Sequence, residues 1–149
     1  MRCPIVSYGL RRRIDLNCTN INLDGTPAAT SGGVAFYGKL PVNTGCQVRV
    51  VRIIAQNLAT AKGGEASTEP VVAIYRCATT VLASCSAMTL TCTSAKAIGA
   101  TWEGTDDSTG ILFSASDYLA ADLYTAAVAA SNNQGEVRLS VEYIDGPLK

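Results

Sequence analysis

The stretch Glu136-Val-Arg-Leu-Ser-Val-Glu-Tyr143 alternates strictly between apolar and polar side chains. Val137, Leu139, Val141 and Tyr143 share one face, while the other face carries charged and hydroxyl groups. A period of two residues is typical of a β-strand with one face on a hydrophobic core and the other in water or against a partner. The pattern therefore predicts a strand over residues 136–143, and much of the remaining chain repeats it.

Six further segments have strand character. In Gln47 to Ala55, Val48 and Val50 share one face and Val51 and Ile53 the other, which indicates a β-bulge near Val50. In 14–23 the apolar face also changes, because Ile14, Leu16 and Cys18 precede Ile21 and Leu23. The other segments are 34–40, 71–77, 81–85 and 88–92, and in the last of these threonines occupy the polar face.

Turn signals such as Asp24-Gly25, Asn43-Thr-Gly45 and Asp145-Gly146 separate these segments at short intervals. Short alternating strands with frequent turns predict an all-β sandwich or barrel in one domain, residues 14–149, preceded by an N-terminal arm over residues 1–13. Residues 117–130 are ambiguous, because they contain no Gly or Pro and their two leucines are four apart, as on a helix. We favour a short turn over residues 116–121 followed by a strand, with a helix as the alternative.

Charge and composition restrict the possible functions. The 149 residues include 12 basic and 12 acidic side chains and no histidine. Zero net charge argues against general nucleic-acid binding, and the missing histidine removes the commonest general base and metal ligand. Only 16% of residues are charged, which favours a surface partly covered by neighbouring chains. We therefore expect no enzyme and no cofactor.

The N-terminal sequence does not predict a secretory signal, because its short apolar stretch precedes the basic cluster Arg11-Arg12-Arg13. No apolar run reaches the roughly 18 residues of a membrane-spanning helix, so we expect no membrane partner. The six cysteines, at positions 3, 18, 46, 77, 85 and 92, leave two alternatives. Most are small buried side chains, or some form disulfides, for which Cys77 with Cys85 and Cys85 with Cys92 are the best candidates.

Four segments of the strand pattern carry a family resemblance. They are QVRVVRIIAQN (47–57), PVVAIYR (70–76), ILFSASD (111–117) and GEVRLSVEY (135–143). Together they resemble the small jelly-roll virion proteins of tailed bacteriophages, the capsid decoration or cement proteins and related head and tail accessory proteins. The similarity spans residues 34–143 and is one of strand pattern rather than of a single specific motif.

The resemblance implies a jelly-roll-like antiparallel β-sandwich that acts as a structural virion protein. Such a domain binds the outer surface of the major capsid lattice, often as a homotrimer, and stabilises the head by bridging capsid subunits. Its partners would be the major capsid protein and copies of itself, after assembly in the host cytoplasm. The alternative is a carbohydrate-binding β-sandwich of a phage fibre or a secreted lectin.

Five residues are candidates for partner binding. Arg11, Arg12 and Arg13 could dock the arm on an acidic groove of a capsid lattice, with Tyr8 as an anchor, or they could be a solvated basic stretch at a strand edge. Trp102 could stack on a sugar, beside a loop whose carboxylates Glu103, Asp106 and Asp107 are too few for a calcium site. We favour an exposed acidic turn with a half-buried tryptophan. Asp117 and Asp122 are interpreted as turn residues.

Overall fold

The alternating segments form antiparallel strands arranged in two sheets, and no helix occurs in the residues that the structure describes. This computed structural model describes residues 11–23, 35–40, 42, 47–58, 66–78, 85–93, 96–104, 110–125, 128–129 and 135–146. The strands are β1 (Arg11–Asn22), β2 (Ala35–Gly38), β3 (Gln47–Asn57), β4 (Ala66–Thr68), β5 (Val71–Cys77), β6 (Ser86–Thr91), β7 (Thr101–Glu103), β8 (Ile111–Ser114), β9 (Tyr118–Thr125), β10 (Val128–Ala129) and β11 (Glu136–Gly146).

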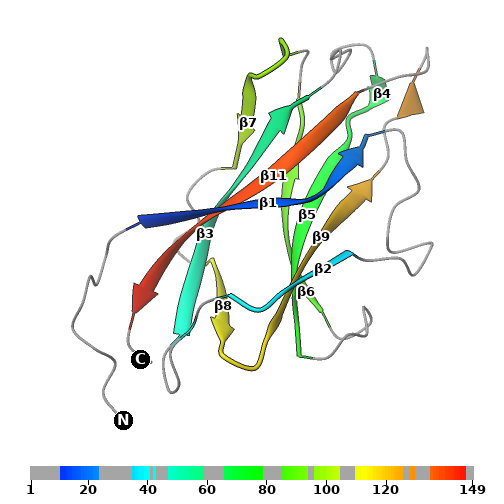
Figure 1. Cartoon of the computed structure of the whole chain (residues 1–149). Coiled ribbons are helices and arrows are strands. Elements are labelled where there is room, and N and C mark those ends of the chain that lie inside the picture. The colour runs from blue at the N-terminus through cyan, green and yellow to red at the C-terminus, as the bar shows by residue number, and fades with distance from the viewer. Residues whose placement is uncertain are drawn as a thin grey trace.

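The two sheets form the layers of a β-sandwich (Figure 1). The first sheet has the order β1-β11-β3-β7, and β8 pairs with the other end of β3. The second sheet has the order β2-β9-β5-β6, and β4 pairs separately with β10. All pairings among the described strands are antiparallel.

The core lies between the sheets and is built from the apolar faces that the alternation predicts. Val137, Leu139, Val141 and Tyr143 of β11 are all buried in it. They meet apolar side chains of β5 and β9 from the second sheet, among them Val72, Ile74, Leu119, Ala121 and Leu123. The prediction of an all-β sandwich from alternating strands is therefore confirmed.

The predicted bulge in β3 is confirmed by the pairing register. Glu142 pairs with Arg52 while the next residue, Tyr143, pairs with Val50, so Val51 is the extra residue. The bulge returns Ile53 and Ala55 to the core face after Val50. In β1 the register likewise shifts between Leu16 and Ile21, where the apolar face was expected to change.

The starts of β1 and β9 differ from the expectations. β1 begins at Arg11, so residues 11–13 belong to the sandwich and not to an arm, because their backbone pairs with the last strand. β9 begins at Tyr118 directly after a turn at 115–116, so the strand alternative is confirmed and the turn is shorter than expected. Residues 1–10, and 81–84 of the expected 81–85 strand, lie outside the described part of the chain.

Candidate interaction surfaces

The expected basic arm is instead the start of an edge strand. Arg11, Arg12 and Arg13 pair with Ile144, Tyr143 and Glu142 of β11. Among the described strands β1 pairs only with β11, so it lies at an edge of its sheet. This placement agrees with the alternative of a basic stretch at a strand edge, where positive charge opposes pairing with another chain. Tyr8 lies outside the described residues.

Arg13 is held in a polar cluster on the outer face of the first sheet. Its Nε lies 3.1 Å from Asp15 Oδ1, and its Nη2 donates to Ser140 Oγ at 3.0 Å. The Ser140 hydroxyl in turn donates to Asp15 Oδ1 at 2.6 Å. This hydrogen bond, together with Arg13, holds the pKa of Asp15 below its ordinary value despite some desolvation. The guanidinium group of Arg13 is therefore bound within its own sheet.

The same outer face continues across β3 and β7. Arg52 Nε lies 3.7 Å from Glu142 Oε2, and Arg52 Nη1 lies 3.3 Å from Glu103 Oε2. Thr101 Oγ1 donates to Glu103 Oε1 at 3.3 Å. Exposed ion pairs of this kind contribute little to stability, about 0–1 kcal/mol each. Their main effect is on recognition, since Arg52, Glu103 and Glu142 are already paired within the chain.

Trp102 does not form a sugar-stacking platform, and the expectation of a half-buried ring is also wrong. Its side chain is 4% exposed and belongs to the core between the sheets. The indole Nε1 donates to the Thr93 carbonyl at 2.6 Å. The alternation in β7 explains this burial, because Thr101 and Glu103 on either side point outward. Asp106 and Asp107 lie outside the described residues.

One end of the sandwich is closed by Arg76 and Asp117. Arg76 Nη1, from β5, donates to the Leu112 carbonyl of β8 at 3.2 Å, so this side chain connects the two sheets. Its Nε lies 3.9 Å from Asp117 Oδ2. That oxygen also accepts hydrogen bonds from the Ser114 amide at 2.7 Å and the Ser114 hydroxyl at 2.9 Å. Asp117 is thus a turn residue, as predicted, whereas Asp122 lies within β9.

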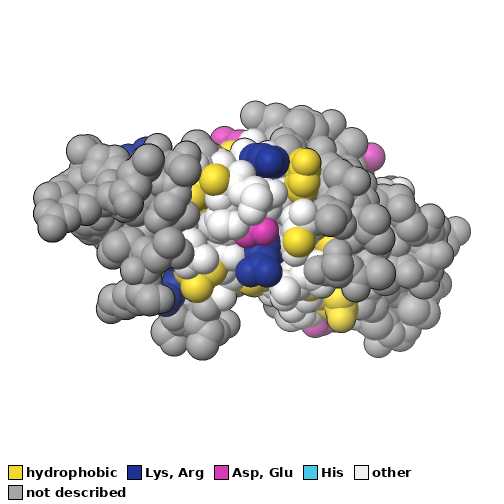
Figure 2. Space-filling view, turned by 90° about the horizontal axis from the view of Figure 1, so that it is seen from below, with side chains coloured by type: hydrophobic (Ala, Val, Ile, Leu, Met, Phe, Trp, Pro, Cys, Tyr) yellow, Lys and Arg dark blue, Asp and Glu magenta, His cyan; other side chains and the backbone are white. Residues whose placement is uncertain are grey.

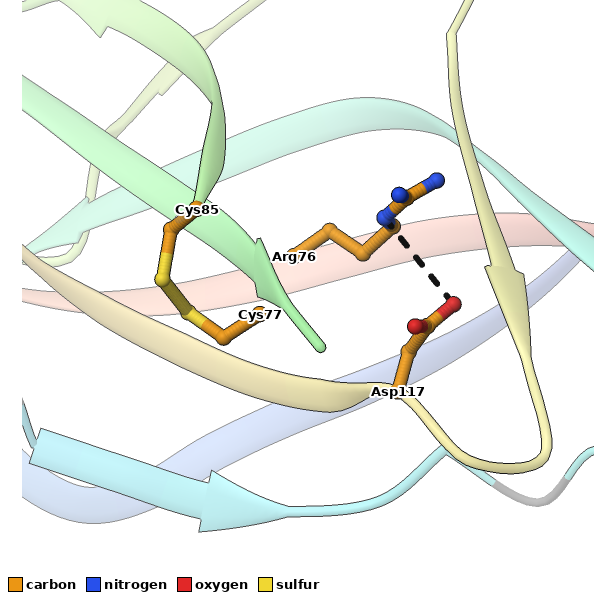
Figure 3. Close-up of a disulfide and its surroundings, with 4 residues drawn as sticks. All are labelled: Arg76, Cys77, Cys85 and Asp117. Carbon is orange, nitrogen blue, oxygen red and sulfur yellow. Dashed lines mark ion pairs between the residues drawn. A yellow bond between two sulfur atoms is a disulfide. The ribbon is translucent and has the colours of Figure 1, made fainter. Parts of the chain in front are cut away.

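Figure 2 views the molecule from this end. Basic and acidic side chains lie together in the middle of the described surface, with hydrophobic side chains on both sides. Figure 3 shows Arg76 directed toward Asp117 on one side of β5, and Cys77 on the other side bonded to Cys85. The carboxylate is occupied by backbone, hydroxyl and guanidinium groups, an arrangement that fastens the β8–β9 turn.

The cysteines divide between the two alternatives left open by the sequence. Cys77 and Cys85 form a disulfide across the β5–β6 hairpin, with Cα atoms 4.3 Å apart, so one of the two candidate pairs is confirmed. The alternative of small buried side chains was an expectation for most of the cysteines and does not apply to this pair. It holds for Cys92, which is free and buried, and burial raises the pKa of its thiol to about 12. A thiol so far from ionisation is unreactive at neutral pH.

Sequence reasoning treated Gly99 as a turn signal, and the structure has a turn at residues 97–100, but Ile98 was not singled out. Ile98 at its tip is 67% exposed, more than any other large hydrophobic side chain among the described residues. Ala97-Ile-Gly-Ala100 has glycine at the third position, which is typical of a type II turn. The segment lies between β6 and β7, a few residues before Trp102.

Comparisons with known proteins give no relative. No family model, no curated protein and no solved structure matches this chain. Within the described residues, no group of three or more histidine, cysteine or carboxylate side chains is arranged to hold a metal ion. The same residues include no helix of the length and hydrophobicity needed to span a membrane.

Proposed function

We propose that this chain is a structural protein of tailed-bacteriophage particles, a capsid decoration protein that binds the outer surface of the major capsid lattice and stabilises the head. The proposal has no enzymatic component and no cofactor. Its partners are the major capsid protein and copies of this chain in a homotrimer. The resemblance in strand pattern suggested this function, and the strand order is the single observation that supports it most.

The strand order supports a jelly roll as the finer description of the sandwich. In that fold a ribbon of four antiparallel strand pairs wraps into two four-stranded sheets. Here the four pairs are β1 with β11, β2 with β9, β3 with the short strands β7 and β8, and β5 with β6. The chain changes sheet at every connection along the ribbon except the β5–β6 hairpin and the step between β7 and β8. Viral capsid proteins and lectins commonly use this architecture.

Two further observations favour a virion protein over an intracellular enzyme. The Cys77–Cys85 disulfide suits a protein that works in an oxidising environment, such as the surface of a released particle. Two side chains of types that enzymes often use are also in structural use: Asp117 fastens a turn and Cys92 is buried. On the outer face of the first sheet, Arg52 is paired with Glu103 and Glu142 within the chain, which suits docking to a neutral protein surface better than to a polyanion.

The test is the composition and heat resistance of particles released from the source culture. Density-purified, DNA-filled particles should contain this chain in a fixed ratio to the major capsid protein, on their outside, where antibody labelling reaches it. Particles from a deletion strain should release DNA at a lower temperature, and added recombinant protein should restore the original temperature. Absence of the chain from washed particles would contradict the proposal. Saturable binding to a glycan array instead would favour the carbohydrate-binding alternative, using a surface other than Trp102.

A further inference from the structure

We propose that the open edge of β6 pairs with β6 of a second copy of this chain, antiparallel and about a two-fold axis at Thr89. The pairing joins the second sheets of the two copies into one continuous sheet. This inference goes beyond the proposed function, because it concerns the free protein and needs no capsid. It adds a contact to the proposed homotrimer and links two trimers edge to edge.

The outer edge of β6 presents backbone groups that have no partner in the described part of the chain. Among the described strands β6 pairs only with β5, at the end of its sheet. The Cys92 amide donates to the Pro70 carbonyl at 2.9 Å, so every second residue back from Cys92 also bonds to β5. The amides and carbonyls of Ala87, Thr89 and Thr91 therefore point away from β5. These three residues are exposed, so nothing in the chain covers this edge.

β6 differs from the other edge strands in having no protection against pairing. Among the edge strands that the structure describes, β2, β4, β7, β8 and β10 have four residues or fewer. The longer β1 begins with three arginines. β6 has six residues without charge or proline, and no charged residue occurs between Arg76 and Lys96. Proteins usually block long edges with charge, proline or a covering segment, so an unblocked edge indicates that a strand binds there.

The sequence of β6 is complementary to itself in an antiparallel arrangement. With Thr89 opposite Thr89 of the second copy, Ala87 lies opposite Thr91, so outward residues meet outward residues. Each of these pairs can exchange two backbone hydrogen bonds. On the outer face threonine meets threonine, which is a favourable cross-strand pair. On the core side, the partly buried Met88 lies opposite Leu90 of the second copy, which covers more of its apolar surface.

Charge and symmetry favour an identical copy as the partner. Pairing β1 with itself would bring arginines of two copies together, whereas β6 meets itself without like-charge repulsion. A contact between identical surfaces closes about a two-fold axis and covers both open edges at once. A different protein would have to supply an open strand edge of its own, whereas every copy of this chain already has one.

The experiment measures the mass of the free recombinant protein by sedimentation velocity, from micromolar to millimolar concentration. The wild-type mass should double as concentration rises. Thr89→Lys and Thr89→Glu each place like charges opposite one another at the axis, and each should weaken the association at least about tenfold. An equimolar mixture of the two variants should restore it, because an ammonium group then faces a carboxylate. Ala115→Lys, at an exposed position of the β8–β9 turn, is the matched control and should associate like the wild type.

Amide hydrogen exchange gives a second readout at single residues. In concentrated wild-type protein the outward amides of Ala87 and Thr91 should exchange slowly, because they are bonded to the second copy. In Thr89→Lys they should exchange fast. The inward amides of Met88 and Leu90, which bond to β5, should be protected in both proteins, and this protection shows that the variant is folded.

Each contrary result is distinct. A wild-type mass that does not double at any concentration overturns the inference, while binding to particles remains a separate test of the decoration function. If Thr89→Lys associates as the wild type does, the contact lies elsewhere. If the mixture of variants does not restore association, the two strands do not meet at Thr89. Protection of the outward amides only after another protein is added would assign the edge to a different partner, which also overturns the inference.

Discussion

Gly110 and Gly99 both have positive φ, of 31° and 86°, yet their surroundings differ. A Cβ at Gly110 would lie 2.5 Å from the Val50 carbonyl oxygen, whereas one at Gly99 would meet nothing within 4 Å. We expect Gly110→Ala to destabilise the fold by about 2–4 kcal/mol, since backbone strain and a steric clash add. Gly99→Ala, the control, should cost about 1 kcal/mol from strain alone. Urea denaturation of both variants measures the difference, and equal losses would contradict the close approach of Gly110 to β3.

Asp15 and Asp122 have pKa values shifted in opposite directions. Hydrogen bonds and Arg13 lower the pKa of Asp15, so its contribution to stability is present at neutral pH and is lost as pH falls through its folded-state pKa. Burial raises the pKa of Asp122 against a weaker opposing hydrogen bond from the Leu123 amide. Its folded state binds the proton more tightly, so stability is lost as pH rises through the window between its unfolded and folded pKa values.

Replacing the Asp122 carboxylate by a neutral amide tests the direction of this pKa shift. Asp122→Asn keeps an oxygen for the Leu123 amide, which donates to Asp122 Oδ1 at 2.7 Å. We expect the variant to melt at a higher temperature than the wild type at pH 7 and at the same temperature near pH 3, where both side chains are neutral. Ser140→Ala should instead raise the pKa of Asp15, as measured by NMR titration. A lower melting temperature for Asp122→Asn at pH 7 would contradict the desolvation of Asp122.

At the scale of single residues, the sequence predicted which face of a strand a side chain occupies better than it predicted what that side chain does. Alternation placed the apolar side chains of β11 in the core, because local period and burial agree there. The alternation of Thr101, Trp102 and Glu103 also indicates a buried tryptophan, but the composition of the surrounding loop suggested a binding site instead. The role of Arg13 depends on Ser140, 127 residues away in the chain, so no local pattern could reveal it.

The β5–β6 hairpin is the element with a covalent constraint. Cys77 and Cys85 are 8 residues apart, and closing a loop of this size stabilises the folded state by about 2–3 kcal/mol through the unfolded chain. We expect the double variant Cys77→Ser, Cys85→Ser to lose about that much free energy of unfolding in urea. Peptide mass analysis after alkylation under native conditions should recover Cys77 and Cys85 as one linked pair and leave Cys92 unmodified. Ready alkylation of Cys77 and Cys85 without reduction would contradict the pairing.

Element boundaries were predictable where both neighbours in the sheet follow the same period. β5 has the bounds expected from its alternation, and the bulge of β3 was visible as a change of phase. β1 was assigned too late a start, because three consecutive arginines have no strand pattern of their own. Their conformation is set by backbone pairing with β11, which sequence alternation does not record. Residues 118–125 form a strand despite helical propensity, because β5 and β2 pair with them on both sides.

For the whole molecule, the proposed function predicts an assembled state in solution. Each copy has a mass of 15.5 kDa, and native mass spectrometry of unreduced protein should show a species of three times that mass. Several contacts per trimer would combine weak single-site affinities into firm attachment to a repeating lattice. The same spectrum should show two hydrogens fewer for each disulfide. A monomer at all micromolar concentrations would contradict the homotrimer, and cryo-electron microscopy of particles would then decide whether single copies decorate the shell.

The central position of β11 also sets the timing of folding. β11 lies between β1 and β3, so the first sheet cannot close until β11, which follows the other described strands in the chain, has joined its middle. Pairing of strands so distant in the chain makes folding slow, because a large loop must close before these contacts form. Until then β1 and β3 expose unpaired edges to other nascent chains. Aggregation during high-level expression, relieved by slower synthesis at lower temperature, is the practical consequence for anyone who produces this protein.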